Sequence, residues 1–146
     1  MTLENNLWRV VRAKLSPFGE LARVENRLAA GTPDVCLVVR ARASEPARTA
    51  WLELKALPAW PKRARSPVVA PHLTLEQVLW LERWDAAGGR AGLLAQVAQT
   101  YLLLDPPAVR AWHGGGLARI DLLELARYHQ RALFPTTEVL RWATAT

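Results

Sequence analysis

The chain has 146 residues, 51% of them hydrophobic, which suits one domain with a substantial core, and its single cysteine, Cys36, excludes an intrachain disulfide or a multi-cysteine zinc site. Nineteen Lys and Arg against 13 Asp and Glu give a formal net charge of +6, which favours a polyanionic partner, nucleic acid ahead of an anionic membrane surface. No apolar stretch approaches the ~20 residues that a bilayer span needs, and residues 1–11 lack a signal-peptide pattern, so we expect a soluble cytoplasmic protein without a membrane partner.

The first residues of the chain show the periodicity of a helix. Thr2 can cap a helix that runs to about Leu15. On a helical wheel, Glu4 falls within the apolar stripe of this helix, so we expect its carboxylate to point inward. Residues 21–28 then alternate charged and apolar side chains, which predicts a half-exposed strand.

Two apolar runs with charged residues at particular positions come next. The run "VCLVV" at 35–39 predicts a strand buried on both faces, and "TAWLELKAL" at 49–57 predicts a strand beside it. In the second strand Glu53 and Lys55 leave the same face, with their Cα atoms ~6.6 Å apart, and Asp34 begins the neighbouring strand. Carboxylates that converge without histidine or thiolate partners favour a hard oxygen site for Mg²⁺ or Mn²⁺.

Residues 58–71 are rich in proline and in basic side chains, which predicts a stiff loop that leaves the strand carrying Glu53. A basic loop in this position is well placed to hold phosphates. Trp60 in the same loop could stack on a base. The candidates for DNA contact in this loop are Lys62, Arg63 and Arg65.

The remaining elements are predicted from caps and breakers. Thr74 and Gln77 fit a capping box, which predicts a helix that ends before Gly88. The elements expected after it are two strands or one broken strand up to residue 105, an edge strand at "VRAWH", a helix over about 117–133, and a short helix after Pro135.

Chemically distinctive residues follow one another in a particular order: Glu4 in the first helix, "TPD" at 32–34, "ELK" at 53–55, and Gln77 at the start of the following helix. This order and spacing resemble the PD-(D/E)XK nuclease superfamily. Within it, "ENRLAAGTPDVCLVV", "WLELK" and "LTLEQVLWLERWDAAGG" look like the branch that holds archaeal-type Holliday junction resolvases and VRR-type nucleases, many of them from phages. The resemblance covers roughly residues 2–100.

The resemblance implies an α/β fold of the restriction-endonuclease type. Such a fold has an αβββαβ core and a mixed sheet of about five strands flanked by helices. For this chain it implies a single nuclease domain over 1–146, with its core at about 2–105 and a helical extension at about 115–146.

The resemblance also implies roles for individual residues. Lys55 would be the catalytic lysine, and Gln77 a helper on the second helix. Arg23 and Arg27 are the candidates for the basic residues that resolvases carry before the second strand, and hence for DNA contact. The implied ligands of Mg²⁺, for which Mn²⁺ should substitute, are Asp34, Glu53, the backbone carbonyl of Leu54, and Glu4.

Together these features predict a Mg²⁺-dependent DNA endonuclease of a bacterial or phage-infected cell, with a four-way Holliday junction as the favoured substrate. A two-fold symmetric substrate would suit a homodimer that uses the tryptophan-rich second helix as its contact. Two alternatives stay open: a VRR-type nuclease acting on flaps, ends or duplex DNA, and a catalytically inactive nucleic-acid-binding module. The sequence contains no G-x-x-x-x-G-K-[ST] loop, so we expect no nucleotide cofactor.

Overall fold

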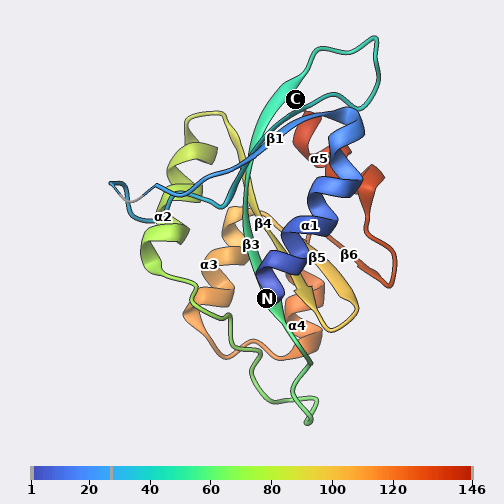
Figure 1. Cartoon of the computed structure of the whole chain (residues 1–146). Helices are drawn as coiled ribbons and strands as arrows, with labels where there is room; N and C mark the ends of the chain where they lie inside the picture. Colours follow the sequence, from blue (N-terminus) through green and yellow to red (C-terminus); the bar gives the residue numbers. More distant parts are fainter. Residues whose placement is uncertain (1, 27, 146) are drawn as a thin grey trace.

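The start of the chain folds as its cap and periodicity predict. In the computed structural model, which describes residues 2–26 and 28–145, helix α1 (Leu3–Leu15) is capped by Thr2, whose hydroxyl accepts a hydrogen bond from the Asn5 N–H at 3.1 Å. Figure 1 shows this helix lying alongside the sheet. The elements that follow it are the 3₁₀ helix η1 (Ser16–Phe18) and the strands β1 (Gly19–Arg23), β2 (Val35–Val39) and β3 (Arg48–Leu57).

Helix α2 (Leu75–Ala86) begins with the predicted capping box. The Thr74 hydroxyl accepts a hydrogen bond from the Gln77 N–H, and the Gln77 side chain accepts one from the Thr74 N–H. Among the helices of the described residues, none is both long and apolar enough to cross a membrane. The later elements are β4 (Arg90–Val97), β5 (Thr100–Leu104), α3 (Pro106–Gly114), α4 (Arg119–Leu125), β6 (Tyr128–Arg131) and α5 (Thr136–Thr144).

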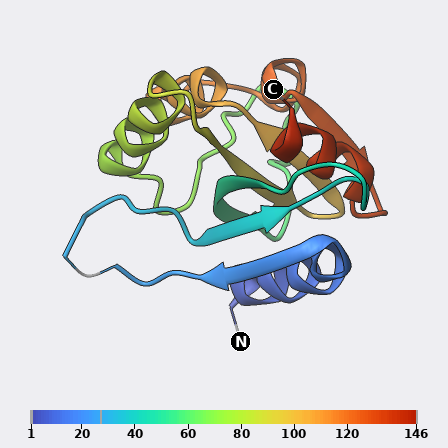
Figure 2. The same cartoon turned by 90° about the horizontal axis from the view of Figure 1, so that it is seen from above.

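Six strands form one mixed sheet in the order β1-β2-β3-β4-β5-β6. Neighbouring strands are antiparallel except β3 and β4, which run parallel because α2 carries the chain back between them. Helices α1 and α5 pack on one face of the sheet, and α2 and α3 on the other (Figures 1 and 2). The predicted α/β class and the αβββαβ order are confirmed, although the sheet has six strands rather than about five.

Strand β3 is central to the sheet, and its side chains alternate as predicted. Leu52 and Leu54 join the core beneath α1 and α5, whereas Trp51 packs with the core beneath α2 and α3. Burying one leucine side chain contributes about 1.5–3 kcal/mol, so apolar packing holds β3 from both sides. Glu53 and Lys55, which alternate with these leucines, lie on the same face of the sheet as α2.

Two predictions for the first strands are wrong in extent or in burial. The half-exposed strand comes earlier than 21–28, because β1 ends at Arg23, where its pairing with β2 also ends. In β2, Val38 is 40% exposed, so this strand is not buried on both faces. Helix α2 packs mainly on β4, which lies two strands from β2 in the sheet. It therefore leaves the face of β2 that carries Val38 uncovered.

The segment after β5 differs most from prediction. "VRAWH" belongs to helix α3 and not to an edge strand, because Pro106 and Pro107 occupy the first helical positions, where the N–H groups have no helical partner. The next helix, α4, ends at Leu125, and β6 then pairs with β5, so the C-terminal extension is not wholly helical. The short helix expected after Pro135 is confirmed as α5.

Candidate active site

Glu53 and Lys55 are the buried charged side chains of the part of the chain that the structure describes. Each is 2% exposed, and Lys55 Nζ lies 3.2 Å from Glu53 Oε1. Taking each charge out of water costs several kcal/mol, and apolar residues of similar size often stabilise a fold as well as a buried ion pair does. A buried ion pair on the central strand is therefore a candidate for function rather than for stability.

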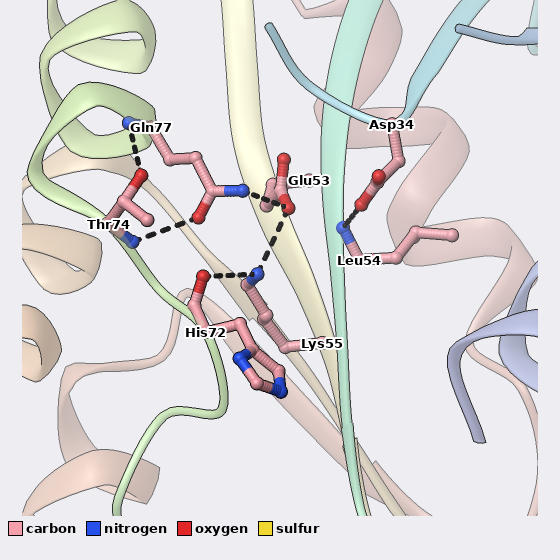
Figure 3. A network of polar contacts seen from close by, with 7 residues as sticks. All are labelled: Asp34, Glu53, Leu54, Lys55, His72, Thr74 and Gln77. Atoms are coloured by element: carbon pink, nitrogen blue, oxygen red, sulfur yellow. Dashed lines mark hydrogen bonds and ion pairs between the residues drawn. The ribbon is translucent and has the colours of Figure 1, made fainter. Parts of the chain in front are cut away.

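Two acceptors fix the Lys55 ammonium (Figure 3). Besides the Glu53 carboxylate, Nζ donates to the backbone carbonyl of His72 at 3.2 Å. His72 has a φ of 54°, in the left-handed region, just before the cap of α2. An ammonium group has three N–H donors, so Lys55 keeps one donor for a substrate or a water molecule.

Gln77 joins the N-terminus of α2 to the Glu53 carboxylate. Its Nε2 donates to Glu53 Oε1 at 2.9 Å, while its Oε1 accepts from the Thr74 N–H at 3.0 Å (Figure 3). One amide therefore completes the capping box and holds the carboxylate at the same time. The capping box alone predicts the backbone position of Gln77, and the structure adds a hydrogen bond from its side chain to Glu53.

Asp34 meets β3 at the point where the pairing of β2 with β3 ends. The last paired residues are Val35 and Leu52, and beyond them the Leu54 N–H donates to Asp34 Oδ2 at 2.8 Å (Figure 3). The N–H and C=O of one residue in a strand point to the same edge. The Leu54 carbonyl therefore faces the edge of β3 on which Asp34 lies.

The charge of Glu53 is poorly compensated. Burial raises the pKa of this carboxyl, the adjacent Asp34 carboxylate raises it further, and Lys55 lowers it, with a result of about 9 against an ordinary value of 4.5. The second oxygen, Glu53 Oε2, is buried without a hydrogen-bond partner. A cation bound by Asp34 and Glu53 would offset the repulsion and give this oxygen a partner.

These oxygen atoms fit a magnesium ion. Mg²⁺ prefers hard oxygen ligands and commonly takes one or two carboxylates while it keeps several waters. Asp34, Glu53 and the Leu54 carbonyl would supply such a set. Within residues 2–26 and 28–145, no group of three or more His, Cys, Asp and Glu side chains is placed to hold a metal ion, so the protein's share of the ligands would come from two carboxylates and a backbone carbonyl.

Glu4 lies near this set without joining it. It is half-buried in the first turn of α1, and burial raises its pKa, while Lys55 lowers the pKa and Asp34 raises it. These influences place Glu4 within electrostatic reach of the site. Among the described residues, Glu4 does not form a metal-holding group with Asp34 and Glu53. The structure therefore does not place Glu4 as the direct ligand that the resemblance implied.

The basic candidates lie outside the buried set. Arg23, exposed at the end of β1, donates to Asn5 Oδ1 at 2.7 Å and so ties this strand to α1. Arg27 lies outside the described residues. Three candidates are exposed on the loop between β3 and α2: Lys62, Arg63 and Arg65.

No protein-family model matches the chain, and a search of curated proteins finds no match either. Two adjacent carboxylates and a carbonyl can bind a hard cation, and a tethered lysine beside them can contact an anionic group.

Proposed function

We propose that this chain is a Mg²⁺-dependent endonuclease that hydrolyses phosphodiester bonds in DNA, with a four-way junction as its favoured substrate. The observation that carries the proposal is the buried pair of Glu53 and Lys55 beside Asp34, with Glu53 Oε2 lacking a partner. A fold gains little from burying these groups, whereas hydrolysis of a phosphodiester uses each of them.

Each residue of the site has a part in this proposal. Bound Mg²⁺ would neutralise charge on the phosphodiester and supply a more acidic water. Asp34, Glu53 and the Leu54 carbonyl would hold the ion, and Gln77 keeps the Glu53 carboxylate in its orientation. Lys55, with one N–H donor free, would orient the attacking water or stabilise charge on the phosphate oxygens.

The preference for a four-way junction rests on the motif resemblance and on the positive charge of the chain. A net charge of +6 and exposed basic side chains on the loop after β3 favour a polyanionic substrate. The first alternative, a VRR-type nuclease that cuts flaps, ends or duplex DNA, uses the same site and differs only in substrate. The second alternative, a catalytically inactive binding module, shares only the basic surface.

We also propose a homodimer, because a four-way junction offers two equivalent strands to two equivalent sites. Leu75 and Leu79, one turn apart on α2, are 45% and 36% exposed and would suit a contact with a second copy. Sedimentation velocity at micromolar concentration should give the mass of two chains. A single species of 16.3 kDa would remove this part of the proposal.

The test is a cleavage assay on a labelled four-way junction and on a linear duplex with the same arm sequences. We expect paired symmetric nicks in the junction with Mg²⁺ or Mn²⁺, and no product in EDTA or with Glu53→Ala. Glu45→Ala serves as the matched control, because Glu45 is an exposed glutamate on the turn between β2 and β3.

Other outcomes assign the site differently. Equal cutting of both substrates would keep the roles of Asp34 and Glu53 but favour the general nuclease. Binding that Glu53→Ala leaves unaltered and that no divalent metal converts into cutting would favour the inactive binding module.

A further inference from the structure

A second basic feature lies beyond the catalytic end of β3. A cavity of about 740 Å³ is lined by the start of the loop after β3, by the turn between β4 and β5, and by residues of the C-terminal segment. Two arginines line it, Arg119 at the start of α4 and Arg131 at the end of β6, and no carboxylate does. Because its charged walls are of one sign, the cavity favours an anionic ligand.

Both arginines are available to a ligand. Each is exposed, and neither forms an ion pair with any residue in 2–26 or 28–145. By contrast, Arg110 and Arg127 on the neighbouring elements are engaged by Glu82 and Asp105. The Arg119 guanidinium lies over the ring of Trp60, 4.7 Å from its centroid, so an aromatic contact orients this charge without neutralising it.

The walls of the cavity are connected through the backbone. The Ala98 N–H donates to the Leu57 carbonyl at 3.0 Å, which joins the β4–β5 turn to the end of β3. The Ala132 N–H donates to the Gln99 carbonyl at 2.8 Å, which joins the end of β6 to the same turn. The arginines therefore stand on a framework of regular elements, which suits a preformed site.

The cavity also lies near the candidate active site along the chain. Its lining includes Pro58, three residue steps from Lys55, which is ~10 Å of extended chain or about three base steps along a duplex axis at ~3.4 Å each. Trp60 packs against the core beneath α2 and α3, which is the face on which Glu53 and Lys55 lie.

We propose that Arg119 and Arg131 form a second phosphate-binding site, which holds the backbone of the substrate strand about three nucleotides from the bond that is cut. This inference rests on the proposed nuclease function for the identity of the ligand, a nucleic-acid phosphate. It gives the C-terminal segment a role in substrate binding, which neither the motifs nor the catalytic residues assign to it.

The test measures binding of the labelled junction and duplex by fluorescence anisotropy in EDTA, where no cutting is needed. Arg119→Gln with Arg131→Gln should weaken binding about tenfold at 0.1 M salt, as expected for losing charge-assisted contacts. The slope of log K against log salt should fall by about 0.9 for each arginine. Arg42→Gln removes the same charge from the turn before β3, at the opposite end of that strand, and should change affinity less than twofold.

The outcomes separate this inference from the proposed function. If the double variant binds as tightly as Arg42→Gln while Glu53→Ala abolishes cutting, the second site is wrong and the nuclease stands. If the double variant loses affinity and salt dependence but the wild type never cuts, the site stands as a nucleic-acid contact and the nuclease fails. Competition by millimolar dAMP would instead assign the cavity to free nucleotides and would overturn the strand contact.

Discussion

At the scale of single residues, the burial of Glu53 couples the stability of the metal-free protein to pH. Burial and the neighbouring Asp34 raise its pKa to about 9, whereas the ordinary value is 4.5. Between these pH values the folded chain holds a proton that the unfolded chain has lost, so stability falls as pH rises. Because Glu53 accounts for a difference of one proton at most, it can change the equilibrium constant of unfolding by at most about tenfold per pH unit.

The measurement is urea unfolding in EDTA at several pH values between about 5 and 9, the range in which the folded chain holds this proton and the unfolded chain has lost it. We expect Glu53→Gln, which keeps the shape and carries no charge, to flatten the decline in the free energy of unfolding. An unchanged decline in this variant would mean that Glu53 is not the group responsible.

Gln77 offers a second prediction at this scale, because it serves both the helix cap and the carboxylate. Gln77→Ala removes both contacts, whereas Thr74→Ala removes the hydroxyl that accepts the Gln77 N–H but leaves the contact with Glu53 in place. Each substitution should cost about 1 kcal/mol of stability. Only Gln77→Ala should also lower the cleavage rate, by about 10- to 100-fold, since a misplacement of about 1 Å in the site can cost ~100-fold.

Cleavage rates and urea midpoints of these two variants, measured side by side, decide the role of Gln77. Equal losses of activity would make Gln77 a cap residue and nothing more. A loss confined to Gln77→Ala would make it a positioning residue for Glu53.

At the scale of elements, the loop between β1 and β2 touches α2 at Gly31. Its φ is +84°, and a Cβ at this position would overlap the backbone of Glu76 and Gln77. Asp34 follows three residues later, so a shift of the loop would also move a candidate ligand. An alanine in the left-handed conformation costs about 1–2 kcal/mol of stability. Gly31→Ala should cost more than this because of the overlap with α2, and it should reduce cleavage as well.

Gly115 supplies the matched control for this prediction. It has the same φ of +84°, and no atom lies within 4 Å of an added Cβ. The difference in the free energy of unfolding between Gly31→Ala and Gly115→Ala, measured in urea, separates the cost of the overlap with α2 from the cost of backbone strain. Equal costs would show that the contact of the loop with α2 is unimportant to the fold.

Elements were predictable where local rules and packing agree. Alternation in a strand determines that Glu53 and Lys55 leave one face, and the capping box places Gln77 at the start of α2. The contact of Lys55 with the His72 carbonyl was not predictable, because any residue carries a carbonyl and only the left-handed turn at His72 directs this one.

The C-terminal elements were missed for a different reason. Prolines break most helices but are favourable in a first turn, so Pro106 and Pro107 begin helix α3 where the sequence pattern predicted an edge strand. Strand β6 has the sequence "YHQR", which lacks an apolar alternation, and it exists because the open edge of β5 pairs with it. The approach of Arg119 to Trp60 depends on this tertiary arrangement and has no trace in local sequence.

At the scale of the whole molecule, a chain with a net charge of +6 is expected to repel a divalent cation, so the proposed Mg²⁺ binding would depend on local carboxylates. A ligand that binds only the folded state stabilises it by about 2.7 kcal/mol at 100 times its Kd. For a chain of this size that corresponds to a rise in Tm of roughly 5–10 °C.

Thermal unfolding with Mg²⁺ or Mn²⁺ against EDTA measures this rise directly. We expect the rise in the wild type and in Glu45→Gln, whose exposed carboxylate lies on the turn between β2 and β3, but not in Glu53→Gln. The shift on adding metal is compared rather than Tm itself, because replacing the buried carboxyl group of Glu53 changes the stability of the metal-free protein. An equal shift in Glu53→Gln would mean that the cation binds elsewhere, and the assignment of Asp34 and Glu53 as its ligands would fail even if the protein cuts DNA.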